Sequence, residues 1–413
     1  MQRRSFLKSM GSLLALGALP QFSRAWAAPA KTGKPKILLR SSWQTVNIGD
    51  IAHTPGVLHL LEEHFPEAEV GLWPSSVNDG VRELLLARFP QLTIVQSKEE
   101  VDAALKEYDF LLHGSGPSLV GAKEVSRWAG ETGKPYGIFG VTLGTFDEPT
   151  LKLVNGAKFT YFRDPVSLER AKAKGAACPI MEFGPDGAFA VDLANPSTAD
   201  DFLTKNHLTP GGFVCCIPRL RYTPYWLIKN QKFDEKKHAR NEEMAEHDHA
   251  PLREAITAVV RESQAKVLLC PEDRSQMKVG KELILDKLPA DVRDRVVWRE
   301  NYWLTDEALS VYRQSAGLFG LEMHSPIMCI GNGIPALVGR FEEQTSKGTM
   351  WRAIGLEDWL FDFDQPDQLA RLTPTVLALV KDPTAAQEKA EVARKFVAAK
   401  QKAMVEQVKA SLG

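Results

Sequence analysis

The stretch of sequence that decides the fold is KILLRSSWQTVNIGD, residues 36–50. Its apolar start, Ile37–Arg40, predicts a buried strand, and the polar loop that follows carries a glycine at Gly49. Beyond the loop, Thr54-Pro55 is typical of a helix start, with a cap residue followed by proline at the first helical position. A short strand, a glycine-containing loop and a helix make up the unit that repeats in parallel α/β sheets.

Short apolar runs and amphipathic stretches alternate from Lys36 onward, which is the pattern of βαβ units. The fold class is therefore predicted to be α/β, with two Rossmann-like, doubly wound sheets. Strands are predicted in the first half at Ile37–Arg40, Glu69–Leu72, Leu92–Ile94, Phe110–Leu112, Tyr136–Val141 and Phe159–Arg163. Strands are predicted in the second half at Gly212–Ile217, Lys266–Cys270, Val296–Trp298, Leu318–Leu321 and Pro335–Val338.

Domain boundaries are expected where this alternation is interrupted. The polar, proline-bearing stretch Ala194–Thr198 is the predicted linker. It separates an N-terminal domain over residues 36–194 from a C-terminal domain over residues 204–361, and a helical segment over residues 366–413 follows. The stretch Pro383–Leu412 predicts an amphipathic helix packed across the domains, with apolar residues at Val392, Phe396, Val397, Met404 and Val408.

The N-terminus has the pattern of an export signal. The motif RRSFLK (residues 3–8) and a modestly apolar stretch from Met10 to Pro20 are typical of a twin-arginine signal peptide. The small-x-small pattern before Ala28 predicts cleavage there, so residues 1–28 are expected to be the signal. The twin-arginine translocase would then export the folded protein to the periplasm or another extracytoplasmic compartment. An uncleaved anchor is the alternative, although a spanning helix needs ~20 apolar residues.

Composition excludes several classes of protein. The chain of 413 residues is 44% hydrophobic and 25% charged, as expected for a globular protein. A formal net charge of −1 gives no electrostatic reason to bind nucleic acid. The cysteines show no C-x-x-C spacing for zinc or redox chemistry, so buried packing is expected and a disulfide remains an alternative. They are Cys178, Cys215, Cys216, Cys270 and Cys329.

Two further helix starts are marked by capping residues. Ser97 and Glu100 form the ends of a capping box. Asp164 stands directly before Pro165, which is the arrangement of a cap ahead of a first-turn proline. Helices are therefore predicted to begin after Ser97 and after Asp164.

The loops after the strands are where function is expected, because parallel α/β sheets bind ligands outside the carboxyl ends of their strands. Two such sheets facing each other would form an interdomain cleft. The loop Ser42–Asp50 offers backbone N–H groups and a helix N-terminus suited to an anion or to sugar hydroxyls. A purely structural loop, with Gly49 making the turn, is the alternative. The loop His113–Ser118 also contains glycines, but not in the spacing of a nucleotide-binding motif.

Charged side chains follow strands of the second half as well. Arg219 and Arg221 lie just past its first strand, and their guanidinium groups suit phosphate or carboxylate. Surface salt bridges are the alternative use of these two arginines. His324 follows a later strand, and Lys347 comes soon after it.

Several of these pieces occur in an order that resembles the polysaccharide pyruvyltransferase family. The resemblance covers roughly residues 36 to 360 and includes a glycine-containing loop after His113. The other matching elements are Asn47-Ile48-Gly49-Asp50, Arg163-Asp164-Pro165-Val166-Ser167, Pro185-Asp186, Glu322-Met323-His324, Gly333-Ile334-Pro335 and Lys347.

The resemblance implies a glycosyltransferase-B-like fold of two Rossmann domains. It also implies transfer of an enolpyruvyl group from phosphoenolpyruvate to two hydroxyls of a glycan acceptor, giving a pyruvate ketal and phosphate, with no cofactor. Such chemistry needs a proton carrier, a base for the hydroxyls and cations for the donor. The expected catalytic residue is His324. The expected donor-binding residues are Arg219, Arg221 and Lys347, and the expected acceptor-binding residues are Asn47 and Asp50.

Two features depart from the family pattern. An arginine usually stands two residues before the loop histidine, whereas this chain has Glu322. Phosphoenolpyruvate is also a cytoplasmic metabolite, so an exported enzyme would lack it. The alternative is therefore an exported glycan-binding protein that keeps the fold and has lost or changed the donor chemistry.

A metal protein is a third possibility from the residues alone. His238, His247 and His249 cluster in the polar insertion Lys229–His249, and the last two could bind a divalent ion. H-x-H is common, however, and a solvated loop is the favoured interpretation. No metal ligand is therefore predicted.

Overall fold

The computed structural model describes residues 33–412. The chain divides into two units, Met1–Lys34 and Pro35–Gly413, and every helix and strand described lies in the second. The predicted signal peptide, residues 1–28, lies outside the described residues. Between residues 33 and 412, no helix combines the length and the apolar character needed to cross a bilayer.

The first α/β domain is built on a parallel sheet that has seven strands within the described residues. These are β1 (Lys36–Ser41), β2 (Glu69–Pro74), β3 (Thr93–Ile94), β4 (Phe110–His113), β5 (Tyr136–Val141), β6 (Thr160–Phe162) and β7 (Met181–Phe183). Their order is β3-β2-β1-β4-β5-β6-β7, so β1 lies near the centre, where its apolar run is buried. The helices are α1 (Ile48–His64), α2 (Val81–Arg88), α3 (Lys98–Glu107), α4 (Ala122–Thr132), α5 (Glu148–Gly156), α6 (Pro165–Ala173) and the 3₁₀ turn η1 (Gly187–Ala190).

The second α/β domain has a parallel sheet with six strands among the described residues, in the order β10-β9-β8-β11-β12-β13. The strands are β8 (Phe213–Ile217), β9 (Lys266–Leu269), β10 (Val296–Trp298), β11 (Gly317–Gly320), β12 (Ala336–Arg340) and β13 (Leu360–Asp362). The longer helices are α7 (Pro196–Lys205), α9 (Glu235–Glu262), α12 (Thr305–Tyr312) and α13 (His324–Gly331). Short turns complete it: α8 (Tyr225–Ile228), α10 (Gln276–Val279), η2 (Gly280–Ile284), η3 (Leu285–Lys287), α11 (Ala290–Arg293), η4 (Ser346–Thr349), α14 (Met350–Ala353) and η5 (Glu357–Trp359).

The two domains pack directly against each other. Helix α1 and η1 of the first domain contact α12 and α13 of the second. The approach is close because a Cβ on Gly331 would lie 1.8 Å from the backbone oxygen of Phe189 in η1. The Thr305 hydroxyl donates across the same interface to the carbonyl of Ile48, at 2.9 Å.

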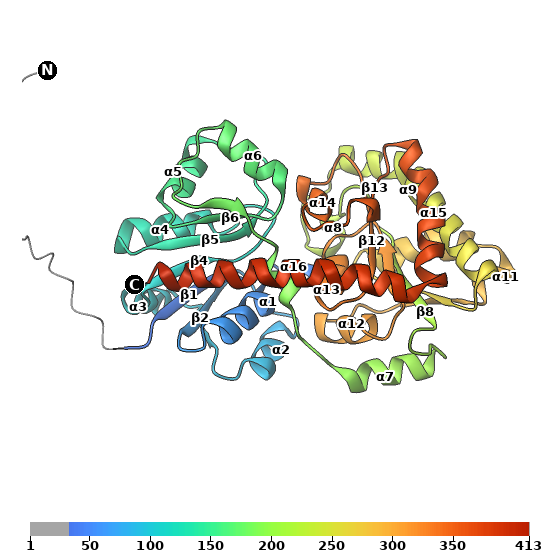
Figure 1. Cartoon of the computed structure of the whole chain (residues 1–413), viewed down its shortest axis with the longest axis horizontal. Helices are drawn as coiled ribbons and strands as arrows, with labels where there is room; N and C mark the ends of the chain where they lie inside the picture. The colour runs from blue at the N-terminus through green and yellow to red at the C-terminus, as the bar shows by residue number, and fades with distance from the viewer. Residues whose placement is uncertain (1–32, 413) are drawn as a thin grey trace, which may run out of the picture. The chain divides into compact units, whose positions relative to one another are not determined.

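Two C-terminal helices complete the described fold. Helix α15 (Pro366–Lys381) packs on α9 and β13 of the second domain. Helix α16 (Pro383–Ala410), the long red helix in Figure 1, contacts α1 and η1 of the first domain and α13 of the second. The side chain of Gln401 in α16 donates to the backbone oxygen of Asp186 at 2.7 Å, which ties this helix to a loop of the first domain.

The face that α16 buries is only partly the predicted one. Val397, Met404 and Val408 are buried, as expected, but Val392 is 71% exposed and Phe396 is 41% exposed. Three inward positions in its first half are taken by small residues, Ala386, Ala390 and Ala393, and Gln401 and Val405 are buried further along the helix. Alanines let a helix approach its neighbours closely, so hydrophobic size was a poor guide to the buried face of this helix.

The predicted start of α1 is wrong. The helix begins at Ile48, and Asn47 caps it by accepting hydrogen bonds from the backbone N–H groups of Gly49 and Asp50. Pro55 therefore lies inside the helix instead of at its first position. An asparagine cap satisfies the otherwise unpaired first-turn donors, and that local gain sets the start.

The polar insertion was predicted as a loop, and this is wrong for most of its length. Helix α9 begins after the cap Asp234 and continues through the insertion to Glu262. Charged helix formers and alanines dominate this segment, so the helix has little apolar periodicity in its first half. His249 is buried on it, with Nδ1 2.7 Å from the carbonyl of Ala245.

Most other local predictions are confirmed. Strands Tyr136–Val141 and Val296–Trp298 have the predicted bounds, whereas the short strands β7 and β13 were missed. The capping box at Ser97 is present, and Asp164 caps α6. The predicted linker is short, since α7 already begins at Pro196. All five cysteines are buried and unpaired: Cys178, Cys215, Cys216, Cys270 and Cys329.

Candidate functional site

Five polar side chains of the first domain form a buried cluster beside the start of α1. His53 Nδ1 lies 2.8 Å from both Ser115 Oγ and Asp186 Oδ1. Arg163 donates to Asp186 and, at 2.9 Å, to the Thr142 hydroxyl. Ser115, Arg163 and Asp186 each follow a strand of the sheet, which brings them to its carboxyl edge.

This cluster determines which nitrogen of His53 is free. Burial would raise the pKa of Asp186, but the charge of Arg163 and the hydrogen bond from His53 hold it well below its usual range. The ionised carboxylate can only accept, so the imidazole donates its Nδ1–H to Asp186. In the neutral imidazole the lone pair is then on Nε2, and this atom is buried without a hydrogen-bond partner among the described residues.

Asp50 lies one helical turn before His53 on α1. Its carboxylate accepts a hydrogen bond from Gln44 and lies 4.0 Å from His53 Nε2. Burial would raise the pKa of Asp50, yet its polar neighbours, among them the donor Gln44 and the ammonium of Lys347, lower it. Asp50 is therefore an ionised carboxylate that faces two histidines.

The second domain contributes His324 to the same place. The rings of His53 and His324 meet edge to face, with centroids 4.9 Å apart. His324 Nδ1 lies 3.3 Å from Glu272 Oε1, and His324 Nε2 is a second buried ring nitrogen with no partner in the described part of the chain. Burial, followed by the charge of Lys347, lowers the pKa of His324 well below its usual range, so the imidazole is neutral.

A network of acids and one arginine lies beside this histidine pair. Arg219 donates to Glu322 at 2.7 Å, and the Gln276 amide donates to the other oxygen of Glu322 at 2.7 Å. Burial and the nearby charge of Glu272 raise the pKa of Glu322, although Arg219 opposes them. The pKa of Asp273 is raised as well, by burial and by the charge of Glu322. The network therefore holds protons near neutral pH.

The predicted site residues are only partly brought together. Asp50, His324 and Arg219 lie in or beside the buried cluster, and Lys347 acts electrostatically on Asp50 and His324. The pKa of Lys347 is lowered by burial and by the charge of Arg219. Asn47, expected to bind the acceptor, uses its side-chain oxygen to cap α1.

Arg221 lies in a different network from His324. All three of its guanidinium nitrogens donate to carboxylates, which are those of Asp248, Glu343 and Asp364. Its contacts are therefore salt bridges, which was the alternative to donor binding for this residue. Arg221 is fully buried, with its guanidinium group against the ring of Phe341 and its carboxylate partner Asp248 on α9.

Several residues of the cluster were missed as candidates. His53 stands three residues after Asp50, and this spacing places two side chains on one face of a helix. The helix was predicted to start only at Thr54, so the two residues were not expected to share a face. Glu272 and Asp273 directly follow β9, so the strand-end rule alone would have found them. Ser115 lies between two glycines of the loop His113–Ser118, and no local pattern marks its hydroxyl as functional.

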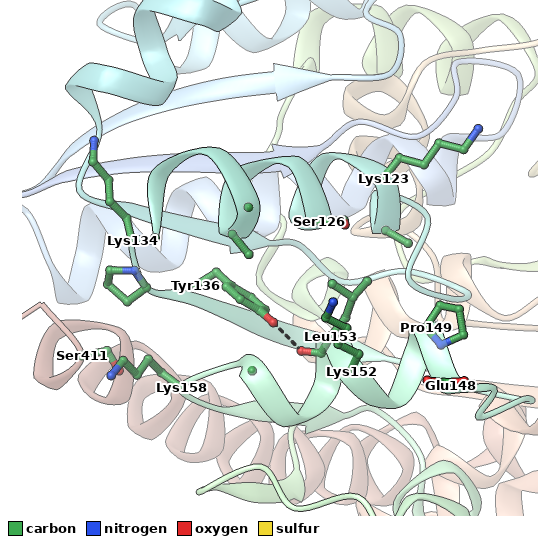
Figure 2. A pocket seen from close by; sticks show the side chains of 16 residues that line it. Lys123, Ser126, Lys134, Tyr136, Glu148, Pro149, Lys152, Leu153, Lys158 and Ser411 are labelled. Atoms are coloured by element: carbon green, nitrogen blue, oxygen red, sulfur yellow. Dashed lines mark hydrogen bonds between the residues drawn. The ribbon is translucent and has the colours of Figure 1, made fainter.

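A surface cavity of about 1240 Å³ lies away from this cluster, between α4 and α5. Figure 2 shows lysines around it, and Tyr136 at its base donates to the carbonyl of Leu153 at 2.7 Å. Among the lining residues are Lys123, Lys134, Lys152 and Lys158. Among its lining residues there is no histidine and one carboxylate, Glu148, so the histidine–carboxylate cluster lies elsewhere, at the domain interface.

Comparisons with known proteins agree with this architecture. The structure of S. aureus MnaA with UDP aligns with a TM-score of 0.58 at 11% identity, over 91% of this chain and 96% of that one. UDP-GlcNAc 2-epimerase from Neisseria meningitidis gives 0.54 at 11%, over 90% and 99%. ADP-heptose lps heptosyltransferase II of E. coli gives 0.50 at 12%, over 86% and 99%. At these identities the likeness shows the fold, which is glycosyltransferase-B-like.

Sequence comparison assigns the family. No curated protein sequence matches the chain significantly. The family model described as polysaccharide pyruvyl transferase matches residues 47–338, which include the Asn47 cap, both histidines of the buried cluster and Glu322. The match extends over most of both domains. The chain therefore belongs to the polysaccharide pyruvyl transferase family.

Proposed function

We propose that this protein transfers a pyruvyl group from phosphoenolpyruvate, or from another anionic donor, to a sugar of an envelope glycan. The observation that carries the proposal is the meeting of His324 with Asp50 and with the cations Arg219 and Lys347 at the domain interface. The addition of a hydroxyl to an anionic enol ester requires a base for the hydroxyl and cations for the donor at the same place.

The reaction would proceed in two additions. The first sugar hydroxyl adds to C2 of the enolpyruvyl group while C3 receives a proton. The second hydroxyl then replaces phosphate at the same carbon, which closes the ketal and releases one proton with the phosphate. Both hydroxyls lose a proton, so a base is needed at each step.

His324 suits the base more than the proton donor. It is neutral, and Glu272 lies against Nδ1, so the partner-free Nε2 carries the lone pair. Glu322 is suited to be the acid, because burial raises its pKa to about 7. Its carboxyl group can therefore hold a proton near neutral pH. The departure from the family arginine would thus replace a donor-binding cation with a proton source.

Donor and acceptor would approach from opposite domains. Arg219 and Lys347, on the second domain, are the proposed partners of the donor's phosphate and carboxylate. Asp50 and Asn47, at the start of α1, lie next to the proposed acceptor hydroxyls. His324 and Asp50 are only 4% and 7% exposed, so either substrate can enter only when the covering segments move apart.

The test is to incubate the purified full chain with phosphoenolpyruvate and a panel of envelope glycans. We expect phosphate release that depends on the glycan, together with a ketal on the glycan detected by mass spectrometry. Arg219→Gln should raise the KM for phosphoenolpyruvate. Arg219→Gln that leaves this KM unchanged would remove Arg219 from the donor site.

A second function is favoured by one contact. Glu322 pairs with Arg219 at 2.7 Å and offsets the positive charge that a donor would need. A glycan-binding protein without transfer chemistry would use the same fold. It would bind glycans in a direct binding assay and release no phosphate with any of them.

A further inference from the structure

Three potential metal ligands of this chain converge at the domain interface. Asp50 and His53 stand three residues apart on α1, and His324 is the first residue of α13. One ligand atom from each lies within 4.8 Å of the other two. Two imidazoles and one carboxylate form a donor set that divalent transition metals favour.

Both imidazoles are oriented for binding by their second nitrogens. His53 Nδ1 lies 2.8 Å from Asp186, and His324 Nδ1 lies 3.3 Å from Glu272. A carboxylate on Nδ1 is the usual outer partner of a metal-ligating histidine, because it fixes the tautomer with the lone pair on Nε2.

The two Nε2 atoms are the unsatisfied part of this arrangement. In the described chain both are buried and lack a hydrogen-bond partner, on residues that are 0% and 4% exposed. A buried polar atom without a partner costs free energy, so native proteins rarely leave two of them in one cluster. His53 Nε2 lies 4.0 Å from the Asp50 carboxylate, and a cation bound among these side chains would satisfy the unpaired nitrogens.

We propose that Asp50, His53 and His324 bind a divalent transition-metal ion of the zinc type. Three protein ligands leave open positions for a substrate oxygen or water. Bonds of about 2.1 Å place ligand atoms about 3.4 Å apart in a tetrahedral site, so the ligand atoms, now within 4.8 Å of one another, must approach by up to about 1.4 Å. The carboxylates of Asp50 and Glu272 favour the cation, and the ammonium of Lys347 opposes it.

The inference goes beyond the proposed function and does not depend on the donor. A cation on Nε2 of His324 would occupy the lone pair assigned above to the base. It would then act on the same hydroxyl in another way, since metal coordination lowers the pKa of a bound hydroxyl or water. Binding is therefore measured separately from turnover.

The probe is Co²⁺, because its visible absorption reports the number and kind of its ligands. We expect the metal-free full chain to bind one equivalent, with a spectrum of a nitrogen- and oxygen-ligated site. His53→Gln and His324→Gln should weaken binding by more than about 100-fold, and Glu272→Gln by about 10- to 100-fold. His59→Ala, on the outer part of the same helix, is the matched control and should bind like the unchanged protein.

Two results would overturn the inference. One is Co²⁺ binding that is equal in the unchanged protein and in His53→Gln and His324→Gln. The other is no Co²⁺ binding by the metal-free full chain, and glycan-dependent phosphate release by that same protein would then leave the proposed function intact. Stoichiometric binding without any turnover would instead support the metal site and contradict the transfer reaction.

Discussion

At the residue scale, Gly49 sets how closely the two domains meet. A Cβ at this position would lie 2.1 Å from Cβ of His324, well inside van der Waals contact. Gly49 is in the first turn of α1, directly before Asp50. The glycine of the N-x-G-D motif is therefore required for the space that the histidine of the other domain occupies, and not for a turn conformation.

Replacing Gly49 with alanine should move His324 away from Asp50. We expect a loss of unfolding free energy of about 1–3 kcal/mol, the usual cost of overpacking, together with a loss of turnover. Denaturant unfolding and phosphate release measure the two effects. Gly144→Ala is the control, because a Cβ there would meet no atom within 4 Å. Equal stability of the two variants would contradict this steric role.

Replacing His324 with alanine should lower turnover by roughly two to four orders of magnitude, the usual scale for an acid or base. Some stability will also be lost, since Glu272 loses a partner at 3.3 Å. The deciding quantity is the specific activity of the folded fraction, measured beside thermal unfolding. Retained specific activity in a less stable variant would make His324 a structural residue.

His113 should make the protein less stable in acid. It is buried, its Nε2 accepts the backbone N–H of Gly121 at 3.1 Å, and burial lowers its pKa to about 3. The unfolded chain takes up this proton near pH 6.5, so the stabilisation is complete above that pH and is lost as the pH falls toward 3. His113→Gln, which keeps an acceptor, should show a smaller fall in unfolding free energy between pH 6.5 and 4. An identical fall in both proteins would refute this assignment.

At the scale of elements, α13 and η1 hold the domains together. Gly331 ends α13 and lies against the backbone of Phe189 in η1. The Asn332 side chain donates to the carbonyl of Val191 at 3.1 Å, so the contact continues past the helix end. These contacts place His324, at the other end of α13, against α1.

Gly331→Ala should therefore destabilise the protein and disturb the site at a distance. The added Cβ would lie 1.8 Å from a backbone oxygen, which cannot rotate away as a side chain can. We expect a loss of about 1–3 kcal/mol in denaturant unfolding. Gly130→Ala in α4 is the matched control, since its Cβ would meet nothing and alanine favours a helix. The interface role fails if Gly331→Ala is as stable as this control.

At the scale of the whole molecule, α16 ties the C-terminus to both domains. It contacts α1, η1 and α13, and Gln401 binds the backbone of Asp186, the residue that orients His53. We propose that the twin-arginine route, which carries folded chains, exports this protein, because residues 3–8 have the sequence RRSFLK.

Replacing Arg3 and Arg4 with lysine should keep the protein in the cytoplasm in folded form. The twin arginines are the proposed recognition feature, and lysine keeps the charge while removing the guanidinium groups. Cell fractionation and N-terminal sequencing measure the outcome. Export of the double variant with a mature N-terminus near Ala28 would show that another signal operates.

The strands and the site were predictable to different degrees. Apolar runs such as Tyr136–Val141 marked strands correctly, because strands buried on both faces have little freedom in composition. The start of α1 and the helix α9 were missed, since a single Asn47 cap and a polar helical face leave weak periodicity. The strand-end rule led to His324 and Arg219 but could not separate Arg219 from Arg221.

The sequence by itself determined the fold class, the main strands and the family motifs, because these depend on local periodicity and on short spacings. Only the tertiary structure decided which of the charged residues meet. It brought His53, Asp50 and His324 within reach of one another and assigned Arg221 to a separate ion-pair network. The physical reason is that contacts between residues some 270 positions apart depend on how two domains pack, and that packing is set by close approaches such as Gly331 on Phe189.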